Sequence, residues 1–143
     1  SPVFILKKEL LRIPIFGWHL KKIGSISIDR NKISKENLGF SDQIKRHVDN
    51  SNRPIIIFPQ ATRVNVLDRT PFKKGVKRIY KELSIFCQPV ALNSGIVWPK
   101  NGYLKPNKTL IISILDPIAP GMNSDEFLNT LQKNIYQEID KMI

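Results

Sequence analysis

The sequence predicts an α/β fold with a mostly parallel or mixed sheet flanked by helices. Short runs of apolar, largely β-branched residues recur along the chain, and segments with apolar residues at helical spacing separate them. Strands that alternate with helices are typical of a sheet with a large parallel part. The 143 residues, of which 41% are hydrophobic, suit one domain with its own core. No internal repeat or linker is apparent, so we expect a single domain over residues 1–143.

The first 30 residues predict a strand, a short helix and a second strand. Residues 3–7 are apolar and have the length of a short buried strand. Pro14 should break any helix that the segment starting with residues 7–11 forms before it. Residues 15–23 have an amphipathic pattern that predicts a helix, which we expect Gly24 to end. Residues 25–29 return to the alternation of a strand.

The middle of the chain predicts a helix, a buried strand and a polar loop. Ser34 is a suitable N-cap for a helix that ends near Asn50. Pro54 introduces residues 55–58, Ile-Ile-Ile-Phe, a run typical of a strand buried on both faces. Residues 59–71 are polar and rich in turn-forming types, which indicates a loop.

The remaining residues predict a basic helix, two strands and a C-terminal helix. The basic helix covers about residues 73–83, and the strands cover residues 85–92 and 109–115. We expect Asn123 or Ser124 to cap the last helix, because two acids follow in its first turn, where the helix dipole favours negative charge. The expected core-facing positions of that helix are residues 127, 128, 131, 135, 139 and 142.

Basic residues are concentrated in the first three quarters of the chain. The net charge is +11, but residues 1–108 hold 21 of the 23 Lys and Arg and 7 of the 12 acids, a net of +14, whereas residues 109–143 carry −3. This distribution suits an anionic partner: acidic phospholipid, a phosphorylated small molecule or nucleic acid. The aromatic residues are not interleaved with the basic ones as base stacking would require, so we expect no nucleic-acid partner.

Several classes of protein are disfavoured by simple counts. The one cysteine, Cys87, allows no disulfide within the chain, and its apolar neighbours predict a small buried thiol. No apolar run reaches the roughly 18 residues that a membrane-spanning helix needs. The sequence has no cluster of metal ligands and no glycine-rich nucleotide loop, so we expect no metal and no bound cofactor.

Residues 55–63 hold the most informative pattern. A buried strand runs into a proline-containing loop, which is where α/β folds place ligand-binding groups. Arg63 lies just beyond this strand, and a guanidinium suits bidentate binding of phosphate. The residues alone therefore indicate a candidate anion site, with an ordinary surface arginine as the alternative.

Residues 56–63, Ile-Ile-Phe-Pro-Gln-Ala-Thr-Arg, resemble the third motif, Phe-Pro-Glu-Gly-Thr-Arg, of the 1-acylglycerol-3-phosphate acyltransferases. Residues 24–30, Gly-Ser-Ile-Ser-Ile-Asp-Arg, resemble the second motif of that family. Residues 72–75, Phe-Lys-Lys-Gly, match the segment after the third motif, and residues 88–95, Gln-Pro-Val-Ala-Leu-Asn-Ser-Gly, resemble the fourth. The likeness covers residues 1–100, is specific as a set, and implies a glycerolipid acyltransferase-like fold.

Two residues depart from the third motif. Gln60 stands where the family has Glu, which keeps the size and hydrogen-bonding capacity of the side chain but removes its charge. Ala61 stands where the family has Gly, which restricts the backbone if the turn requires a positive φ.

The first motif of the family, Asn-His-x-x-x-x-Asp, supplies its general base and the acid that orients the base. Neither histidine of this chain fits that spacing, because Gly24 is the fifth residue after His19 and Asn52 is the fifth after His47. By the family's motif order, we expect the catalytic His and Asp to lie upstream of Ser1 and the domain to be truncated at its N-terminus.

The resemblance implies acyl transfer from acyl-CoA or acyl carrier protein (acyl-ACP), as co-substrate, to the free hydroxyl of lysophosphatidic acid, 1-acylglycerol 3-phosphate. The product would be phosphatidic acid, in phospholipid synthesis. Arg63 and Arg30 would hold the acceptor's phosphate and so orient its hydroxyl. The substrate-binding residues that the resemblance implies are Arg30, Gln60, Ala61, Thr62, Arg63, Lys73 and Lys74. The alternatives are a solvated helix face for the two lysines and, for the whole chain, a non-catalytic basic module that binds lipid or nucleic acid.

The start of the chain also suits a membrane surface. Phe16 and Trp18 with Lys21 and Lys22 resemble an interfacial element, with aromatic rings toward the lipid and ammonium groups at its phosphates. An ordinary core helix with solvated lysines is the alternative. We expect an anionic membrane surface as a partner and a location on the cytoplasmic face of a membrane, peripheral or anchored by residues that precede Ser1.

Overall fold

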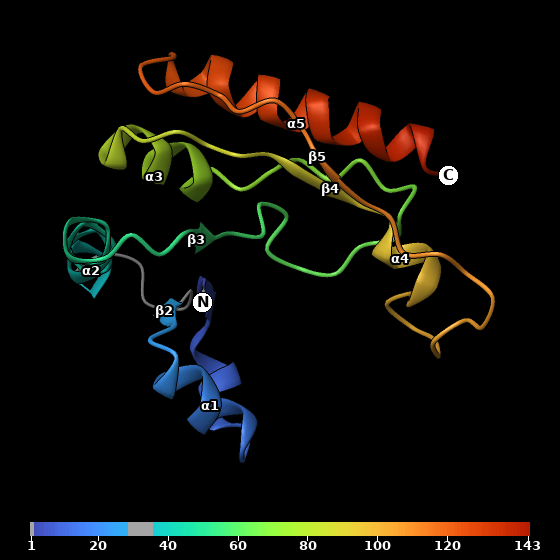
Figure 1. Cartoon of the computed structure of the whole chain (residues 1–143), viewed down its shortest axis with the longest axis horizontal. Helices are drawn as coiled ribbons and strands as arrows, with labels where there is room; N and C mark the ends of the chain where they lie inside the picture. The colour runs from blue at the N-terminus through green and yellow to red at the C-terminus, as the bar shows by residue number, and fades with distance from the viewer. Residues whose placement is uncertain (1, 29–35) are drawn as a thin grey trace. The chain divides into compact units, whose positions relative to one another are not determined.

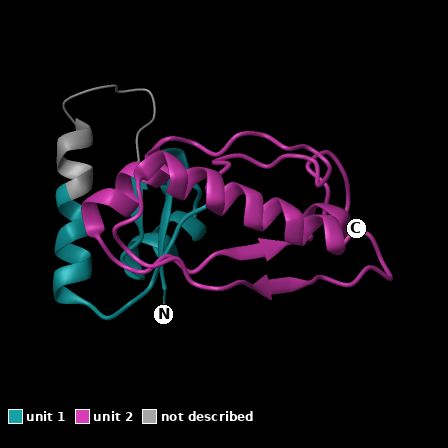
Figure 2. Ribbon diagram, turned by 90° about the horizontal axis from the view of Figure 1, so that it is seen from above, with its two compact units in different colours: residues 1–58 teal, residues 59–143 magenta. Residues whose placement is uncertain are grey.

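A computed structural model describes residues 2–28 and 36–143, which form two compact units, residues 1–58 and residues 59–143 (Figure 1 and Figure 2). The first unit has a sheet of three parallel strands, and the second has an antiparallel pair. Helices accompany both sheets, so the predicted α/β class with parallel and mixed strands is confirmed. The single-domain organisation stays a prediction.

The first unit is organised around β1 (Val3–Lys7), the central strand of its sheet. β2 (Ile26–Ile28) and β3 (Ile55–Ile56) pair with it in parallel, one on each side. The sequence predicted all three strands. Successive side chains of a strand point to opposite faces of the sheet, and those on the covered face are apolar because they are removed from water. The buried side chains of this sheet are Val3, Ile5 and Ile26.

The strand predicted at residues 55–58 is shorter and less buried than expected. β3 covers only Ile55–Ile56, both residues are half-buried, and Phe58 is 56% exposed. The expectation of burial on both faces was therefore wrong. Burial on both faces requires other elements to cover each face of a strand, and β3, an edge strand of the described sheet, is not covered so completely.

In the described part of the first unit, three helices accompany the sheet. A 3-10 helix, η1 (Lys8–Arg12), follows β1 and ends before Pro14, and α1 (Phe16–Lys22) comes next. Gly24 follows α1 with φ +77°, a conformation that glycine adopts without strain, so its predicted role as helix terminator is confirmed. The third helix, α2 (Glu36–Asn50), ends where expected, whereas its predicted cap, Ser34, lies outside the described residues.

The second unit contains three helices and two strands. Its helices are α3 (Gly75–Leu83), the short α4 (Ser94–Val97) and α5 (Ser124–Lys141), and its strands are β4 (Val90–Leu92) and β5 (Ile112–Ile114). Both strands are shorter than predicted, although a bridge between Cys87 and Ile118 continues their antiparallel pairing. The sequence did not predict α4.

α5 provides most of the core of the second unit. Its predicted cap is confirmed: the Asn123 side chain accepts hydrogen bonds from the backbone N–H groups of Asp125 and Glu126. Figure 1 shows α5 running along the β4–β5 pair with α3 beside it. Tyr80 of α3 stacks on Phe127 of α5 with ring centres 3.7 Å apart. The buried residues of α5 are Phe127, Leu131, Ile135, Tyr136 and Ile139, of which Tyr136 was not predicted.

Helix length and hydropathy bear on how the chain meets a membrane. Over residues 2–28 and 36–143, none of the helices combines the length and the apolar character needed to cross a bilayer.

Candidate functional site

The candidate site is the loop that carries the third-motif resemblance, residues 59–73, in the second unit. The backbone N–H of Lys73 donates to the carbonyl of Pro59 at 2.9 Å, so the loop closes at its base. Phe72 is 5% exposed, packs on the ring of Tyr136, and donates its backbone N–H to Gln132 Oε1 at 2.8 Å. These contacts fasten the end of the loop to α5.

Arg63 is fixed on this loop by one end of its guanidinium. Its Nη2 donates to the backbone carbonyls of Trp98 at 3.1 Å and Pro99 at 2.9 Å, and its Cζ lies 5.3 Å from the centre of the Trp98 ring. Within the described residues, Arg63 forms no ion pair with a carboxylate. Its charge is therefore held in place, exposed to solvent and not neutralised by a neighbouring acid.

Gly95 brings the fourth-motif segment close to the same loop. A Cβ atom at this position would lie 3.2 Å from Val66 Cβ and 3.3 Å from the backbone nitrogen of Val66. Such distances are tighter than ordinary van der Waals contact, so a glycine permits the close approach. The loop of residues 59–73 thus meets residues 95–99 at two points, Gly95 against Val66 and Arg63 against Trp98.

Gln60 is part of a hydrogen-bond chain beneath the loop. Its Nε2 donates to the hydroxyl of Tyr136 at 3.2 Å, and that hydroxyl donates to the backbone carbonyl of Thr70. The one hydroxyl proton of Tyr136 is donated to the Thr70 carbonyl, so the hydroxyl oxygen can only accept a hydrogen bond from position 60. An amide satisfies this requirement and an ionised carboxylate does not.

The backbone of Ala61 has a positive φ, the conformation that a glycine at this position of the motif would favour. Its φ is +62°, in the left-handed region that L-residues other than Asn and Asp rarely occupy. The glycine in the family's motif would adopt this conformation without strain. Ala61 therefore keeps the shape of the turn at some cost in stability.

Asn93 has a structural role that the sequence did not reveal. It is 3% exposed, its Nδ2 donates to the carbonyl of Thr109 at 3.1 Å, and its Oδ1 accepts from the N–H of Ile111 at 2.8 Å. The side chain thus pairs with backbone groups just before β5, which satisfies polar atoms that would otherwise be buried alone. Its position in the Asn-Ser-Gly of the fourth-motif resemblance was the available signal.

The remaining predicted site residues are Thr62, Lys73, Lys74 and Arg30. Thr62, Lys73 and Lys74 are exposed, and none of the ion pairs in the described chain includes them. Arg30 lies outside the described residues. Other basic side chains near the loop are already neutralised: Arg69 pairs with Asp140, and Lys77 pairs with Asp125.

Two acids of α5, Asp125 and Glu138, have pKa values below their ordinary ones. A hydrogen bond from Lys77, with its positive charge, holds the pKa of Asp125 below its ordinary value. Hydrogen bonds from Lys141 and Ser113 likewise lower the pKa of Glu138. Both carboxylates therefore stay ionised to lower pH than free ones would, so the second unit keeps these acids paired with cations at neutral pH.

A small cavity of about 70 Å³ lies beneath the loop. It has room for a water or two rather than for a lipid headgroup. Residues from the loop, the fourth-motif segment and α5 line it, among them Gln60, Val66, Asp68, Ser94 and Tyr136.

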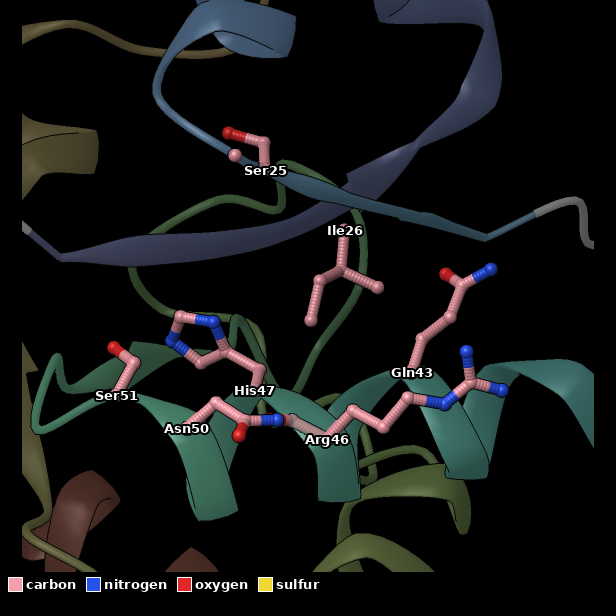
Figure 3. A pocket seen from close by; sticks show the side chains of 8 residues that line it. Ser25, Ile26, Gln43, Arg46, His47, Asn50 and Ser51 are labelled. Carbon is pink, nitrogen blue, oxygen red and sulfur yellow. The ribbon is translucent and has the colours of Figure 1, made fainter.

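A larger cavity of about 420 Å³ lies in the first unit, at the edge where the parallel strands begin (Figure 3). Figure 3 shows His47 and Arg46 of α2 on one side and Ser25 and Ile26 at the start of β2 on the other. His47 Nε2 and Ser25 Oγ are buried and have no hydrogen-bond partner among the described residues. Gly24, Ser25 and Ile26, with which the second-motif resemblance begins, are among the residues that line this cavity.

Two further expectations concern thiols and metals. Cys87 is half-buried rather than fully buried, and desolvation raises the pKa of its thiol. A raised pKa keeps the thiol protonated at neutral pH, as expected of a structural cysteine. Across residues 2–28 and 36–143, no group of three or more His, Cys, Asp or Glu side chains is gathered as metal ligands would be.

The chain matches a known protein family and several curated proteins in sequence. Residues 1–93 match the family described as Acyltransferase. The chain is 31% identical over 123 residues to the 1-acyl-sn-glycerol-3-phosphate acyltransferase of Pseudomonas aeruginosa, covering 85% of this chain and 45% of that protein. It is also 31% identical over 137 residues to the protein of the same name from Helicobacter pylori, covering 94% of this chain and 57% of that one.

Among solved structures, the fold is similar to that of the 1-acyl-sn-glycerophosphate (LPA) acyltransferase, PlsC, from Thermotoga maritima. The TM-score is 0.77 at 19% identity, over 98% of this chain and 56% of that chain. This similarity confirms the predicted acyltransferase-like fold. The chain spans about half the length of the relatives it matches.

Proposed function

This chain belongs to the acyltransferase family, and on that premise we propose that it binds the phosphate of 1-acylglycerol 3-phosphate and takes part in acylating its free hydroxyl. The observation that carries the proposal is Arg63, whose guanidinium is anchored to the Trp98 and Pro99 carbonyls yet has no carboxylate partner among the described residues. A positioned, unneutralised arginine on an exposed loop is the group that phosphate recognition requires.

The way Arg63 is held supports a phosphate role. Its bonds to Trp98 and Pro99 both leave from Nη2, and the guanidinium also lies over the Trp98 ring, which limits its rotation. The N–H groups of Nη1 and Nε are left for an oxyanion. Charge-assisted hydrogen bonds from a guanidinium that is already held bind it more strongly than those from a mobile one, because less side-chain entropy is lost. Lys73 and Lys74 add exposed positive charge at the end of the same loop.

Arg30 belongs to the same proposal. It ends the second-motif resemblance, Gly24 to Arg30, and a second guanidinium on the phosphate would orient the hydroxyl further. Gln60, Ala61 and Thr62 would shape the loop that presents Arg63 rather than bear charge themselves.

The reaction itself requires a general base. The base removes the proton of the acceptor hydroxyl as its oxygen attacks the thioester carbonyl of acyl-CoA or acyl-ACP, the C–S bond breaks, and the thiol leaves with a proton. His19 and His47 lack the spacing of the family's His-x-x-x-x-Asp motif. We therefore propose that a His and an Asp preceding Ser1 perform this step, and that no metal or bound cofactor is needed.

The substrates also suggest where the protein works. A lysophospholipid acceptor partitions into membranes, so the basic chain would act at an anionic membrane surface, which we place on the cytoplasmic side. Nucleic acid is not proposed as a partner.

The experiment compares residues 1–143 with a protein that includes the preceding residues. Thiol release is measured with lysophosphatidic acid and with either acyl-CoA or acyl-ACP, which also identifies the donor. We expect turnover by the longer protein and a rate about a hundredfold or more lower for residues 1–143, since loss of a general base costs at least that much. Equal rates would contradict an upstream base. Lipid binding by both proteins without turnover by either would instead favour the non-catalytic lipid-binding module.

A further inference from the structure

Residues 10–18, around the start of α1, expose an unusual amount of apolar surface. Isolated exposed apolar side chains are common, but several large ones close together mark an interaction surface. Ile15 is 84% exposed and Trp18 is 66% exposed. The exposed apolar side chains of this segment, called here the apolar knuckle, are Leu10, Ile13, Ile15, Phe16 and Trp18.

The packing of α1 explains why these side chains face outward. The buried residues of α1 are Gly17 and Leu20. A Cβ atom at Gly17 would lie 2.1 Å from the carbonyl oxygen of Leu11, so α1 packs against η1 through a position that admits glycine alone. Phe16 and Trp18 flank Gly17 and remain 49% and 66% exposed. They do not form the inner face of an ordinary core helix.

The backbone at the tip of the knuckle is strained. Ile15 has φ +65° and ψ −56°, and the N–H of Phe16 donates to the carbonyl of Pro14 at 2.6 Å. This is a γ-turn of the rarer, strained form, which a β-branched residue adopts at a cost. The turn presents the side chain of Ile15, which is the most exposed of the large apolar side chains in residues 10–18.

The flanks of the knuckle are basic. Between residues 7 and 22 the cationic side chains are Lys7, Lys8, Arg12, Lys21 and Lys22, all exposed, and Glu9 is the one acid. Lys22 Nζ lies 5.1 Å from the centre of the Trp18 ring. An aromatic ring with an ammonium group beside it suits the boundary between acyl chains and lipid phosphates.

We propose that the apolar knuckle inserts into the interface of an anionic phospholipid bilayer, with Ile15 and Phe16 deepest and the flanking lysines on the lipid phosphates. The charge complementarity favours a bilayer over an apolar protein partner. The choice of a bilayer rests on the proposed lipid substrate, but the insertion is measured without substrate or turnover. Failure of either claim is therefore visible separately.

The two tryptophans of the chain, Trp18 and Trp98, provide the test. In Trp98→Phe, the remaining Trp18 reports on the knuckle. We expect its emission to shift to shorter wavelength on vesicles of phosphatidylcholine with phosphatidylglycerol, and brominated acyl chains to quench it. On pure phosphatidylcholine the binding should be weaker, and added salt should weaken binding to the mixed vesicles.

Matched variants locate the effect on the knuckle. Ile15→Ser and Phe16→Ser should each lower vesicle partitioning by roughly tenfold or more, because each removes a large apolar side chain from the lipid. Leu104→Ser, at a residue 66% exposed outside the knuckle, should leave partitioning unchanged. Circular dichroism on each variant confirms that it is folded.

Several results would overturn the proposal. One is Trp18 emission that is already blue-shifted and protected from iodide without vesicles, since another part of the protein or a second copy would then cover the knuckle. A second is equal partitioning of Ile15→Ser and the unsubstituted chain. A third is a loss in Leu104→Ser as large as that in Ile15→Ser.

Discussion

The guanidinium of Arg63 lies over the indole ring of Trp98, 5.3 Å from its centre, and the same arginine donates to the backbone carbonyl of Trp98. This contact joins two segments 35 residues apart in the chain, the loop after β3 and the end of α4. It holds Arg63 in one orientation without neutralising its charge. The acceptor-binding proposal depends on this combination.

Replacing Ala61 by glycine should stabilise the protein. Ala61 has φ +62°, where an L-residue with a Cβ is strained and glycine is not. We expect Ala61→Gly to raise the free energy of unfolding by up to about 1 kcal/mol, part of the relief being offset by the greater freedom of glycine in the unfolded chain. Urea denaturation measures it. Ala119→Gly is the control: Ala119 has no positive φ, so a gain of the same size there would contradict the explanation.

Replacing Gln60 by glutamate, the residue of the family's motif, should destabilise the loop at neutral pH. The ionised carboxylate cannot donate to the Tyr136 hydroxyl, whose own proton is committed to the Thr70 carbonyl. The expected loss is about 1 to 2 kcal/mol in the free energy of unfolding. In a Tyr136→Phe background the difference between Gln60 and glutamate should largely disappear, as a double-mutant cycle would show. An undiminished difference would mean that Tyr136 is not the partner.

Asn93 should matter for stability rather than for chemistry. Asn93→Ala leaves the N–H of Ile111 and the carbonyl of Thr109 without their side-chain partner in a buried position. We expect a loss of about 2 to 3 kcal/mol in the free energy of unfolding. Asn101→Ala, at an exposed residue, should cost much less. Similar losses in the two variants would argue against this role.

The ion pair between Lys77 and Asp125 should make part of the stability depend on pH. The pKa of Asp125 is lowered, first by its hydrogen bond from Lys77, so its contribution is present above the ordinary aspartate pKa and is lost as pH falls through the lowered value. Asp125→Asn should therefore lower the melting temperature near neutral pH and change it little in strong acid. Glu126→Gln, in the same first turn but without Lys77, controls for the helix dipole. A melting-temperature loss in Asp125→Asn that is the same at both pH values would contradict the assignment.

Local patterns in the sequence were sufficient for most of the fold. The strand at Val3–Lys7, the end of α1 at Gly24 and the cap of α5 at Asn123 each depend on neighbouring residues, and all three are confirmed. The burial of residues 55–58 depends on whether other elements cover both faces of β3, which a run of isoleucines does not reveal. The expectation of burial on both faces failed for that reason.

The sequence proposed residues for the candidate site but not the contacts that support them. Arg63 was singled out by the motif resemblance, which also raised the question of φ at position 61, and the structure answers it with +62°. The partner of Gln60 is Tyr136, 76 residues away, and Asn93 pairs with groups 16 and 18 residues away. Such pairs are set by how α5 and β5 pack on the loop, which no local pattern records.

The most direct test of the acceptor-binding claim is the affinity of residues 1–143 for a short-chain, soluble 1-acylglycerol 3-phosphate, measured by calorimetry beside the matching monoacylglycerol without phosphate. We predict that Arg63→Ala and Arg63→Lys each weaken binding of the phosphate ligand about ten- to a hundredfold. Alanine removes the charge, and a lysine ammonium carries its donors on one atom, so it cannot hold the Trp98 and Pro99 carbonyls and also bind the phosphate as the wider guanidinium can. Arg78→Ala, which removes one positive charge from α3, should bind as the unsubstituted chain does, and all three variants should unfold at similar urea concentrations. Undiminished affinity in Arg63→Ala, or a loss in Arg63→Ala that merely follows a loss of folding, would contradict the account and leave Arg63 as a structural clamp on Trp98 and Pro99.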